Sequence, residues 1–223
     1  MCNALPHSRI LYHRSVIAMC GIFGYINHKK NFHKDEKENE KLALAISSKL
    51  THGANDAGGV WVGERAVFAY RYPATEDGCR TNQPMKRMSE GYEFIIVYNG
   101  ELDNMTELGD KLKKFGYRFT TDSDAEILLY SYIHYGTDCL KRLSGDFSFA
   151  IYDSMRRCVV LARDRSGAKP LYYCTLGDTI IFSSERAALF EYPDVKYEEN
   201  TVTSVKPAHF VSIRHGNAVM VAY

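Results

Sequence analysis

The second half of the chain contains a series of short segments rich in β-branched and aromatic residues, and short polar turns separate most of them. Strands joined by such turns pair antiparallel, because a parallel partner would need a crossover of a dozen or more residues. The expected strands lie at residues 147–153, 158–164, 170–175, 179–184, 210–213 and 218–221. The sequence therefore predicts a fold dominated by antiparallel sheet.

The first half of the chain adds helices to this sheet. Apolar side chains recur at helical spacing in residues 40–50, which predicts an amphipathic helix. Further helices are expected at 104–115 and 124–135, strands at 60–62, 66–71 and 92–98, and a loop at 72–91. No repeat or linker divides the chain, so we expect one α+β domain.

Charge and composition argue against several classes of function. The 223 residues include 28 Lys and Arg and 27 Asp and Glu, which gives no basis for binding nucleic acid or an anionic membrane. No apolar run reaches the ~18 residues of a membrane span. The six cysteines and eight histidines show no zinc-site spacing, so neither a metal nor a cofactor is expected. We expect reduced thiols in the cytoplasm, with a Cys158–Cys174 disulfide left open.

The segment Met19-Cys20-Gly21-Ile22-Phe23-Gly24-Tyr25 carries the strongest chemical signal. If the mature chain begins at Cys20, one residue supplies both a thiol and a free α-amine. The amine, with a pKa near ~8, can act as the base that activates the sulfur. The apolar residues that follow predict a buried strand, which would hold the nucleophile at a strand end.

Residues 1–18 are expected to be a leader, and residues 19–223 the domain. Histidines and arginines interrupt the leader before it forms an apolar run of signal-peptide length. Three interpretations stay open: a start codon assigned too early, a removable propeptide, or a genuine arm. We rank the misassigned start first, because Met19 directly precedes Cys20 and is the kind of initiator that is trimmed.

Four other residues have the chemistry that an amide hydrolase needs besides its nucleophile. Asn99 and Gly100 follow a strand expected beside Cys20 in the same sheet, and offer a side-chain amide and a backbone N–H to an oxyanion. Arg71 ends another strand and can bind a carboxylate, while Asp124 begins a helix and can receive an ammonium. Each has a simpler interpretation, as a tight turn, a solvated arginine or a helix cap. The joint occurrence of these residues favours the functional interpretation.

With these residues the chain resembles the class II glutamine amidotransferase domain, an N-terminal-nucleophile hydrolase fold. Within that class it is similar to the amino-terminal half of glutamine-dependent asparagine synthetases. The resemblance covers about residues 19–223. Its motifs, in the family's order, are Met19-Cys20-Gly21-Ile22-Phe23-Gly24, His52-x-x-x-Asp56, Gly59-Val60-Trp61, Arg71, Gln83-Pro84-Met85, Tyr98-Asn99-Gly100-Glu101, Asp122-Ser123-Asp124-Ala125-Glu126, and residues 143–150, 162–173 and 182–185.

This resemblance implies a four-layer αββα sandwich and a role for each candidate residue. Cys20 would attack the side-chain amide of L-glutamine and release ammonia through a thioester, which water then hydrolyses. Asn99 and Gly100 would form the oxyanion hole. Arg71 would hold the glutamine carboxylate, and Asp124 with Glu101 its amino end.

Two departures from the family pattern keep alternatives open. The loop that usually reads His-Arg-Gly-Pro-Asp is His52-Gly53-Ala54-Asn55-Asp56 here, and Pro73 removes a backbone N–H that a ligand could use. One alternative is a weakly active or inactive docking or regulatory module of the same fold. Another keeps the terminal nucleophile but acts on a different amide.

The family's ATP-binding loop, Ser-Gly-Gly-x-Asp-Ser, does not occur in this sequence. We therefore expect one of three arrangements: a synthetase chain that docks in trans, a fragment of a longer protein, or a domain with another task. A homodimer is a further expected form of assembly.

Overall fold

The computed structural model describes residues 20–50, 56–73, 82–198 and 201–223, and within them the chain forms two six-stranded antiparallel sheets. The first sheet contains β1 (Gly21–Asn27), β2 (Asp56–Val62), β3 (Ala66–Pro73), β8 (Tyr172–Leu176), β9 (Thr179–Ser183) and β10 (Val202–Ser204). Their order across the sheet is β10-β8-β9-β1-β3-β2. The first strand therefore lies inside the sheet, with a partner on each side.

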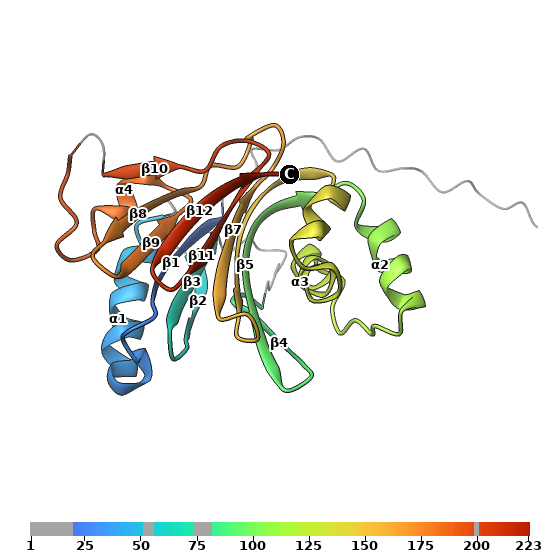
Figure 1. Ribbon diagram of the computed structural model, residues 1–223, viewed down its shortest axis with the longest axis horizontal. Helices are drawn as coiled ribbons and strands as arrows, with labels where there is room; N and C mark the ends of the chain where they lie inside the picture. Colours follow the sequence, from blue (N-terminus) through green and yellow to red (C-terminus); the bar gives the residue numbers. More distant parts are fainter. Residues whose placement is uncertain (1–19, 51–55, 74–81, 199–200) are drawn as a thin grey trace, which may run out of the picture.

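The second sheet faces the first (Figure 1). It contains β4 (Met85–Ser89), β5 (Tyr92–Leu102), β6 (Gly145–Asp153), β7 (Cys158–Arg163), β11 (His209–Arg214) and β12 (Asn217–Ala222). Their order is β12-β11-β7-β6-β5-β4. Short turns join β2 to β3, β6 to β7, β8 to β9 and β11 to β12, as the sequence predicts.

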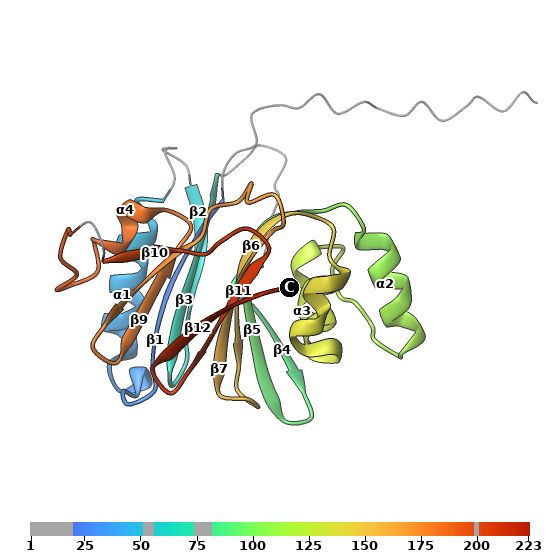
Figure 2. The same cartoon turned by 45° about the horizontal axis from the view of Figure 1, so that its top comes forward.

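Helices cover the outer face of each sheet (Figure 2). The first sheet carries η1 (Phe32–Asp35), α1 (Glu36–Ser47) and α4 (Arg186–Leu189). The second carries α2 (Met105–Lys114), α3 (Asp124–Tyr135) and η2 (Gly136–Arg142). The four layers run helix, sheet, sheet, helix, which confirms the expected αββα sandwich.

Three hydrophobic clusters of described residues fill the spaces between these layers. Strand β1 contributes Ile22 and Ile26 to the cluster between the sheets, and Phe23 and Tyr25 to the cluster under α1. Successive side chains of a strand point to opposite faces, so one short strand serves two cores. Strand β5 alternates in the same way between the inter-sheet core and the core under α3. Both strands are apolar along most of their length because both of their faces are buried.

The structure corrects several expectations about individual elements. The predicted loop at 72–91 contains β4, an edge strand in which only Met85 is buried. Its other side chains are polar or solvent-facing, so its sequence lacks the apolar signal of a strand. Short β10 was also missed. Strand β5 continues through Asn99 and Gly100 to Leu102, so these two residues lie within a strand and not after it.

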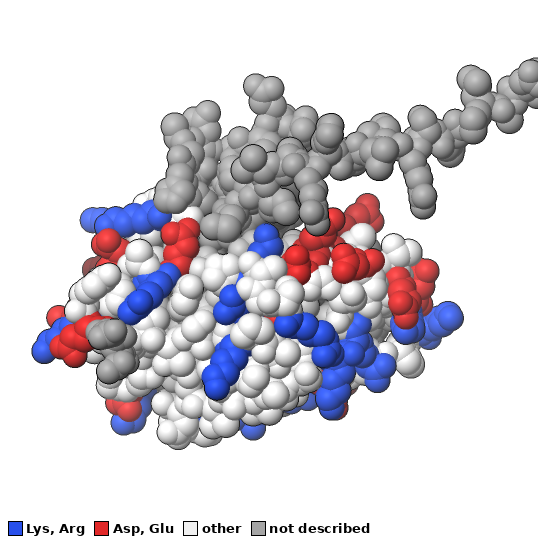
Figure 3. All heavy atoms as spheres, turned by 90° about the horizontal axis from the view of Figure 1, so that it is seen from above, with Lys and Arg blue, Asp and Glu red and all other residues white. Residues whose placement is uncertain are grey.

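Other expectations concern cysteines and residues outside the described part. Cys158 and Cys174 are free and lie in different sheets, which excludes the disulfide left open above. The leader at 1–18, Met19 and loop positions 52–55 lie outside the described residues. Acidic and basic side chains occur together across the face drawn in Figure 3, in keeping with the small net charge. No helix of the described residues is long and apolar enough to cross a membrane.

We predict that Gly24→Ala destabilises the fold. A Cβ at position 24 would lie 2.5 Å from Cζ of Phe182 and 2.6 Å from the carbonyl oxygen of Val67. Overpacking of this kind typically lowers the free energy of unfolding by about 1–3 kcal/mol. Urea unfolding followed by circular dichroism would measure the loss.

Gly109→Ala is the matched control for this change. Gly109 lies inside α2, and its Cβ would meet the flexible tip of Ile127 at 3.3 Å and the ring of Phe119 at an ordinary contact distance of 3.9 Å. Alanine favours the helix by up to about 1 kcal/mol over glycine, so this variant should be neutral or more stable. Equal losses in the two variants would contradict the packing argument.

Candidate active site

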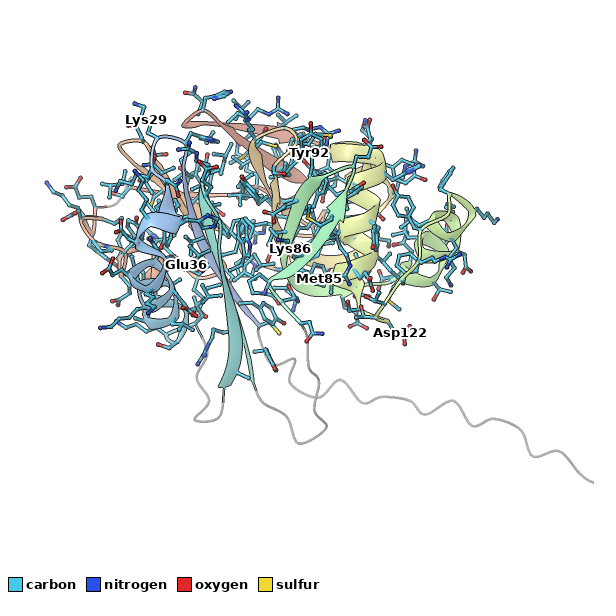
Figure 4. The ribbon with its side chains drawn as sticks, turned by 90° about the horizontal axis from the view of Figure 1, so that it is seen from below. Lys29, Glu36, Met85, Lys86, Tyr92 and Asp122 are labelled. Carbon is cyan, nitrogen blue, oxygen red and sulfur yellow. The ribbon has the colours of Figure 1, made fainter. Side chains whose placement is uncertain are left out.

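A pocket of about 490 Å³ opens where β1 and α3 begin and where β5 approaches its end. Its lining residues come from the start of the first strand, the end of β3, the segment before β4, β5, and the amino end of α3. They are Cys20, Tyr70, Asn82, Gln83, Met85, Tyr98, Gly100, Thr121, Asp122, Ser123, Asp124 and Ala125. Figure 4 shows Met85 and Asp122 on the same side of the molecule. Both sheets and the outer helix α3 therefore contribute to one pocket.

Cys20 lies at the edge of this pocket, directly before β1. Its side chain is partly buried and packs against the inter-sheet core. Ile22, two residues after Cys20 in β1, is held by Ser184, whose hydroxyl accepts a hydrogen bond from the Ile22 N–H at 3.1 Å. A Cβ on Gly21 would lie 2.5 Å from Cβ of Leu50, so only glycine fits directly after the cysteine. The strand thus fixes the thiol at a defined position.

Asn99 and Gly100 reach the site from the opposite sheet. The sequence predicted their strand beside Cys20 in the same sheet, and this is wrong: β5 belongs to the second sheet, and β1 and β5 approach each other across the inter-sheet core. By strand alternation Asn99 lies on the face of β5 that carries Ile95 and Val97, toward the first sheet. The residue is buried.

Gly100 lines the pocket, and only glycine fits at this position. Its φ of +151° is rare for residues with a side chain. A Cβ would lie 2.2 Å from the carbonyl oxygen of Asp146 on the neighbouring strand β6. The absence of a side chain keeps β5 and β6 paired and leaves the backbone of residue 100 accessible to the pocket.

The side-chain amide of Gln83 fixes the backbone before these two residues. Its Nε2 donates to the Tyr98 carbonyl at 3.2 Å, and its Oε1 accepts from the Tyr98 N–H at 2.6 Å. The amide thus pairs with β5 as a neighbouring strand would. A Cβ on Gly59 would lie 2.5 Å from the Gln83 carbonyl oxygen, so glycine there allows the segment to pack against β2.

Asp124 is the first residue of α3, as predicted, and its carboxylate joins that helix to β5. One oxygen accepts the Leu102 N–H at 2.8 Å and the Tyr98 hydroxyl at 3.3 Å. Burial raises the pKa of Asp124 above its usual value, nearby Glu101 raises it further, and these two hydrogen bonds act in the opposite direction. A cation placed in the pocket would favour the ionised carboxylate.

Glu126 holds the pocket wall formed by residues 121–125. Its carboxylate is fully buried and pairs with Arg87 at 2.7 Å. It also accepts from the backbone N–H and the hydroxyl of both Thr120 and Thr121, at 2.7–3.1 Å. These hydrogen bonds outweigh the effect of burial and lower the pKa of Glu126 to about 2. Ser123 caps the helix by accepting the Glu126 N–H at 3.4 Å.

Arg71 and Glu101 lie beside the pocket and are not among the residues that line it. Arg71 on β3 pairs with Gly21, one residue from Cys20, and its Nε is buried with no hydrogen-bond partner among the described residues. A Cβ on Gly58 would lie 2.6 Å from Cδ of Arg71, so the Arg71 side chain packs directly over that glycine. Glu101 is exposed and acts on Asp124 through its charge.

The structure therefore brings Cys20, Gly100 and Asp124 into one pocket, with Asn99 and Arg71 next to it. Sequence reasoning missed the pocket-lining tyrosines Tyr70 and Tyr98 and the bridging role of Gln83. Tyr98 directly precedes the Asn99-Gly100 pair, and that adjacency is the signal that could have drawn attention to it. Among the described residues, no group of three or more His, Cys, Asp or Glu side chains could hold a metal ion.

Comparison with known proteins assigns this chain to a family. The model of the glutamine amidotransferase domain matches residues 19–218. The chain belongs to this family. Glutamine-hydrolysing asparagine synthetase 3 of Bacillus subtilis is 35% identical over 178 residues, which cover 80% of this chain and 28% of that protein. Synthetase 1 of the same organism is 33% identical and covers 86% of this chain and 30% of its own length.

Solved structures show the same fold for this amidotransferase domain. Glutamine phosphoribosylpyrophosphate amidotransferase from B. subtilis superposes with a TM-score of 0.69 at 21% identity, over 91% of this chain and 49% of that one. A structure of the allosteric regulatory enzyme of purine biosynthesis gives a TM-score of 0.70 at 21% identity. The chain spans less than a third of the length of the two Bacillus synthetases that it resembles.

We predict that Glu126→Gln lowers stability by up to about 3 kcal/mol at neutral pH. The folded state holds the pKa of Glu126 at about 2 against an ordinary value of 4.5, and a tenfold change in an acid dissociation constant corresponds to about 1.4 kcal/mol. The stabilisation is complete above about pH 4.5 and is lost as the pH falls toward 2. The difference in urea-unfolding free energy between native chain and variant should shrink over that interval.

Glu107→Gln is the control. Glu107 lies on the exposed face of α2, where it pairs with Lys111, and such pairs contribute at most about 0.5 kcal/mol. A Glu126 variant as stable as this control at neutral pH would show that the buried network does not hold the wall.

Proposed function

We propose that this domain hydrolyses L-glutamine to glutamate and ammonia, with Cys20 as the nucleophile. The observation that carries the proposal is the convergence of Cys20, Gly100 and Asp124 on one pocket, from two sheets and a helix. A thiol, a backbone position free of a side chain and a partly buried carboxylate are the groups that an amide hydrolase acting on an amino acid requires. The relatives named glutamine-hydrolysing synthetases support the same substrate.

The reaction proceeds in two steps. The α-amine of Cys20 takes the thiol proton as the sulfur attacks the side-chain carbonyl carbon of glutamine, and then passes that proton to the departing amide nitrogen. The C–N bond breaks and a thioester forms. Water then attacks the thioester and releases glutamate and the thiol. The α-amine is free only when residues 1–19 have been removed, so this removal is part of the proposal.

The neighbouring residues bind the substrate and stabilise the intermediate. The Asn99 side-chain amide and the Gly100 N–H donate to the oxyanion, and removal of one such donor typically costs 10²–10³-fold in kcat. Asp124 binds the substrate ammonium, with Glu101 at the margin of the pocket. The charge of the ammonium offsets the effect of burial, which raises the pKa of Asp124. Arg71 binds the substrate carboxylate, and this supplies a partner for its buried Nε.

The ammonia requires an acceptor. We propose an ATP-dependent synthetase of the asparagine-forming type, either in a further part of the same protein or in a chain that docks in trans. The names of the relatives support this choice. A homodimer of this domain is compatible with either arrangement.

A non-catalytic docking or regulatory module is the second candidate. It is favoured by one observation, that Arg71 and Glu101 do not line the pocket. This candidate predicts that a chain starting at Cys20 folds but shows no glutaminase activity.

We predict that a chain starting at Cys20 releases glutamate and ammonia from glutamine, and that Cys20→Ala abolishes this turnover without loss of fold. The reason is that no other described cysteine lines the pocket. Glutamate release, measured by coupled assay, and thermal unfolding by circular dichroism would test both parts.

Cys158→Ala serves as the control, because Cys158 is buried in β7 away from the pocket and should leave turnover per folded molecule unchanged. A folded chain starting at Cys20 that releases no glutamate would overturn the proposal and leave the docking module. Intact-mass analysis of the protein from its source would show whether residues 1–19 are absent.

A further inference from the structure

A second pocket, of about 400 Å³, lies at the opposite end of the sandwich from Cys20. The seven residues of β1 separate the two sites by roughly 23 Å, at about 3.3 Å per residue. The second pocket forms where several chain segments meet after β1 and at the turns β2–β3, β6–β7 and β11–β12. It is lined by His28, Glu64, Arg65, Tyr152, Ser154, Arg157 and His215. Figure 4 shows Lys29, the neighbour of His28, far from Met85 and Asp122 of the first pocket.

The groups around this pocket are predominantly basic. Arg65 and Arg157 contribute two permanent positive charges, and His28 and His215 contribute imidazole rings. Glu64 is the one acid among the lining residues, and it pairs with Arg65 at 3.0 Å. Arg65 is further held in place by its hydrogen bond to the Lys30 carbonyl at 3.0 Å. A pocket with this balance of charges attracts anions.

Two of the residues that line this pocket, His28 and His215, lie side by side. Their ring centroids are 5.6 Å apart, and a smaller cavity of about 190 Å³ adjoins the same pair. Nε2 of His28 is buried and has no hydrogen-bond partner among the described residues. Buried polar atoms are nearly always paired, so an unpaired one calls for an explanation. This atom is closed to solvent, so an anion in the pocket would act on the His28 ring through its charge.

Two of the basic side chains project from turn residues with unusual backbone conformations. Arg157 has a φ of +50° and His215 a φ of +49°. Residues other than glycine pay roughly 1 kcal/mol or more for this left-handed conformation. Both residues are exposed and neither fills a core. In each case the conformation places a basic side chain at the pocket, where a bound anion would contact it.

We propose that this pocket is a binding site for a small ligand that carries a phosphate or carboxylate group. Arg65 and Arg157 bind the oxyanion, the protonated His28 attracts it by its charge, and His215 donates a ring N–H to it. The volume of about 400 Å³ falls within the range of pockets for small organic molecules. Buried Tyr152, whose ring packs against Trp61, forms an aromatic wall for the remainder of the ligand. The site is independent of the chemistry at Cys20.

Binding at this site depends on pH. Burial, His215 and Arg65 together lower the pKa of His28 in the empty pocket. The other groups that face this histidine are Glu64 from the β2–β3 turn, Tyr152 and Arg157 from β6 and the turn after it, and Lys29 with its partner Asp178 across the smaller cavity. A bound oxyanion favours the protonated imidazole and raises its pKa. Affinity therefore increases as the pH falls through the histidine range.

Sulfate is the probe that tests the site, because its charge does not change between pH 6 and pH 8. Titration followed by two-dimensional NMR should show saturable shifts confined to the turns that carry Arg65, Arg157 and His215. The imidazole pKa of His28 should be higher in sulfate than in an equal ionic strength of chloride. Shifts spread over the surface, or an unchanged His28 pKa, would overturn the proposal.

Two variants test the contributions of an arginine and of a histidine to this pocket. Arg157→Asn and His215→Asn both keep a residue that tolerates positive φ, so the turns should be retained. Arg157→Asn should weaken sulfate binding about tenfold at both pH values. His215→Asn should also weaken sulfate binding, because it removes an imidazole from the pocket. Arg118→Asn and His134→Gln, which change exposed residues around α2 and α3, are the controls.

The remaining measurements identify the class of ligand. They also distinguish a failure of this proposal from a failure of the glutaminase proposal. Tighter binding of orthophosphate than of succinate would identify a phosphate group, and the reverse a carboxylate; binding of neither would overturn the proposal. Cys20→Ala should bind sulfate as the native chain does. If sulfate binding were lost in Cys20→Ala, or unchanged in Arg157→Asn, the pocket would not be an independent anion site.

Discussion

The packing of one sheet against the other creates the pocket that we propose as the active site. Ile22 and Ile26 of β1 meet Ile95 and Val97 of β5 in a core from which water is excluded. These contacts bring Cys20 close to Asn99 and Gly100, which are almost 80 positions later in the sequence. Neither sheet has a complete site by itself, so the chemistry depends on the same hydrophobic contacts that stabilise the fold.

Two acidic residues at the start of α3 show how environment separates structural from functional roles. Glu126 is surrounded by donors that belong to the protein, so its pKa is low and its charge holds the wall in place. Asp124, two residues earlier, has fewer donors, and its pKa is raised by burial. Its carboxylate gains most from an external cation, which is why we assign the substrate ammonium to Asp124 and a positioning role to Glu126.

The sequence predicts the layers of this fold better than it predicts their contacts. Turn residues and apolar alternation locate most strands, and the predicted helix at 124–135 has the bounds of α3. Edge strand β4 was missed because only one of its side chains is buried, so its pattern resembles a loop. The placement of β5 in the second sheet could not be derived, since strand pairing depends on packing between segments that are distant in sequence.

The same limit applies to the candidate site. Residue chemistry selected Cys20, Gly100 and Asp124, which meet in the pocket, but also Arg71, which lies beside it. Glu101, which the family resemblance added, also lies beside the pocket. Both residues lie within strands, Arg71 in β3 and Glu101 in β5, and no local pattern reveals which strand side chains will line a pocket. The bridge from Gln83 to Tyr98 and the basic pocket around His28 likewise form only when separate turns and strands come together.

Covalent labelling by the glutamine analogue diazo-oxo-norleucine tests the central claim, that the pocket at the start of β1 is a glutamine site with Cys20 as its nucleophile. The account predicts, in a chain starting at Cys20, one adduct on the Cys20 sulfur with loss of N₂, formed more slowly when glutamine is present. Peptide mapping by mass spectrometry would locate it. A folded chain that forms no adduct, or forms one on another cysteine, would contradict the account.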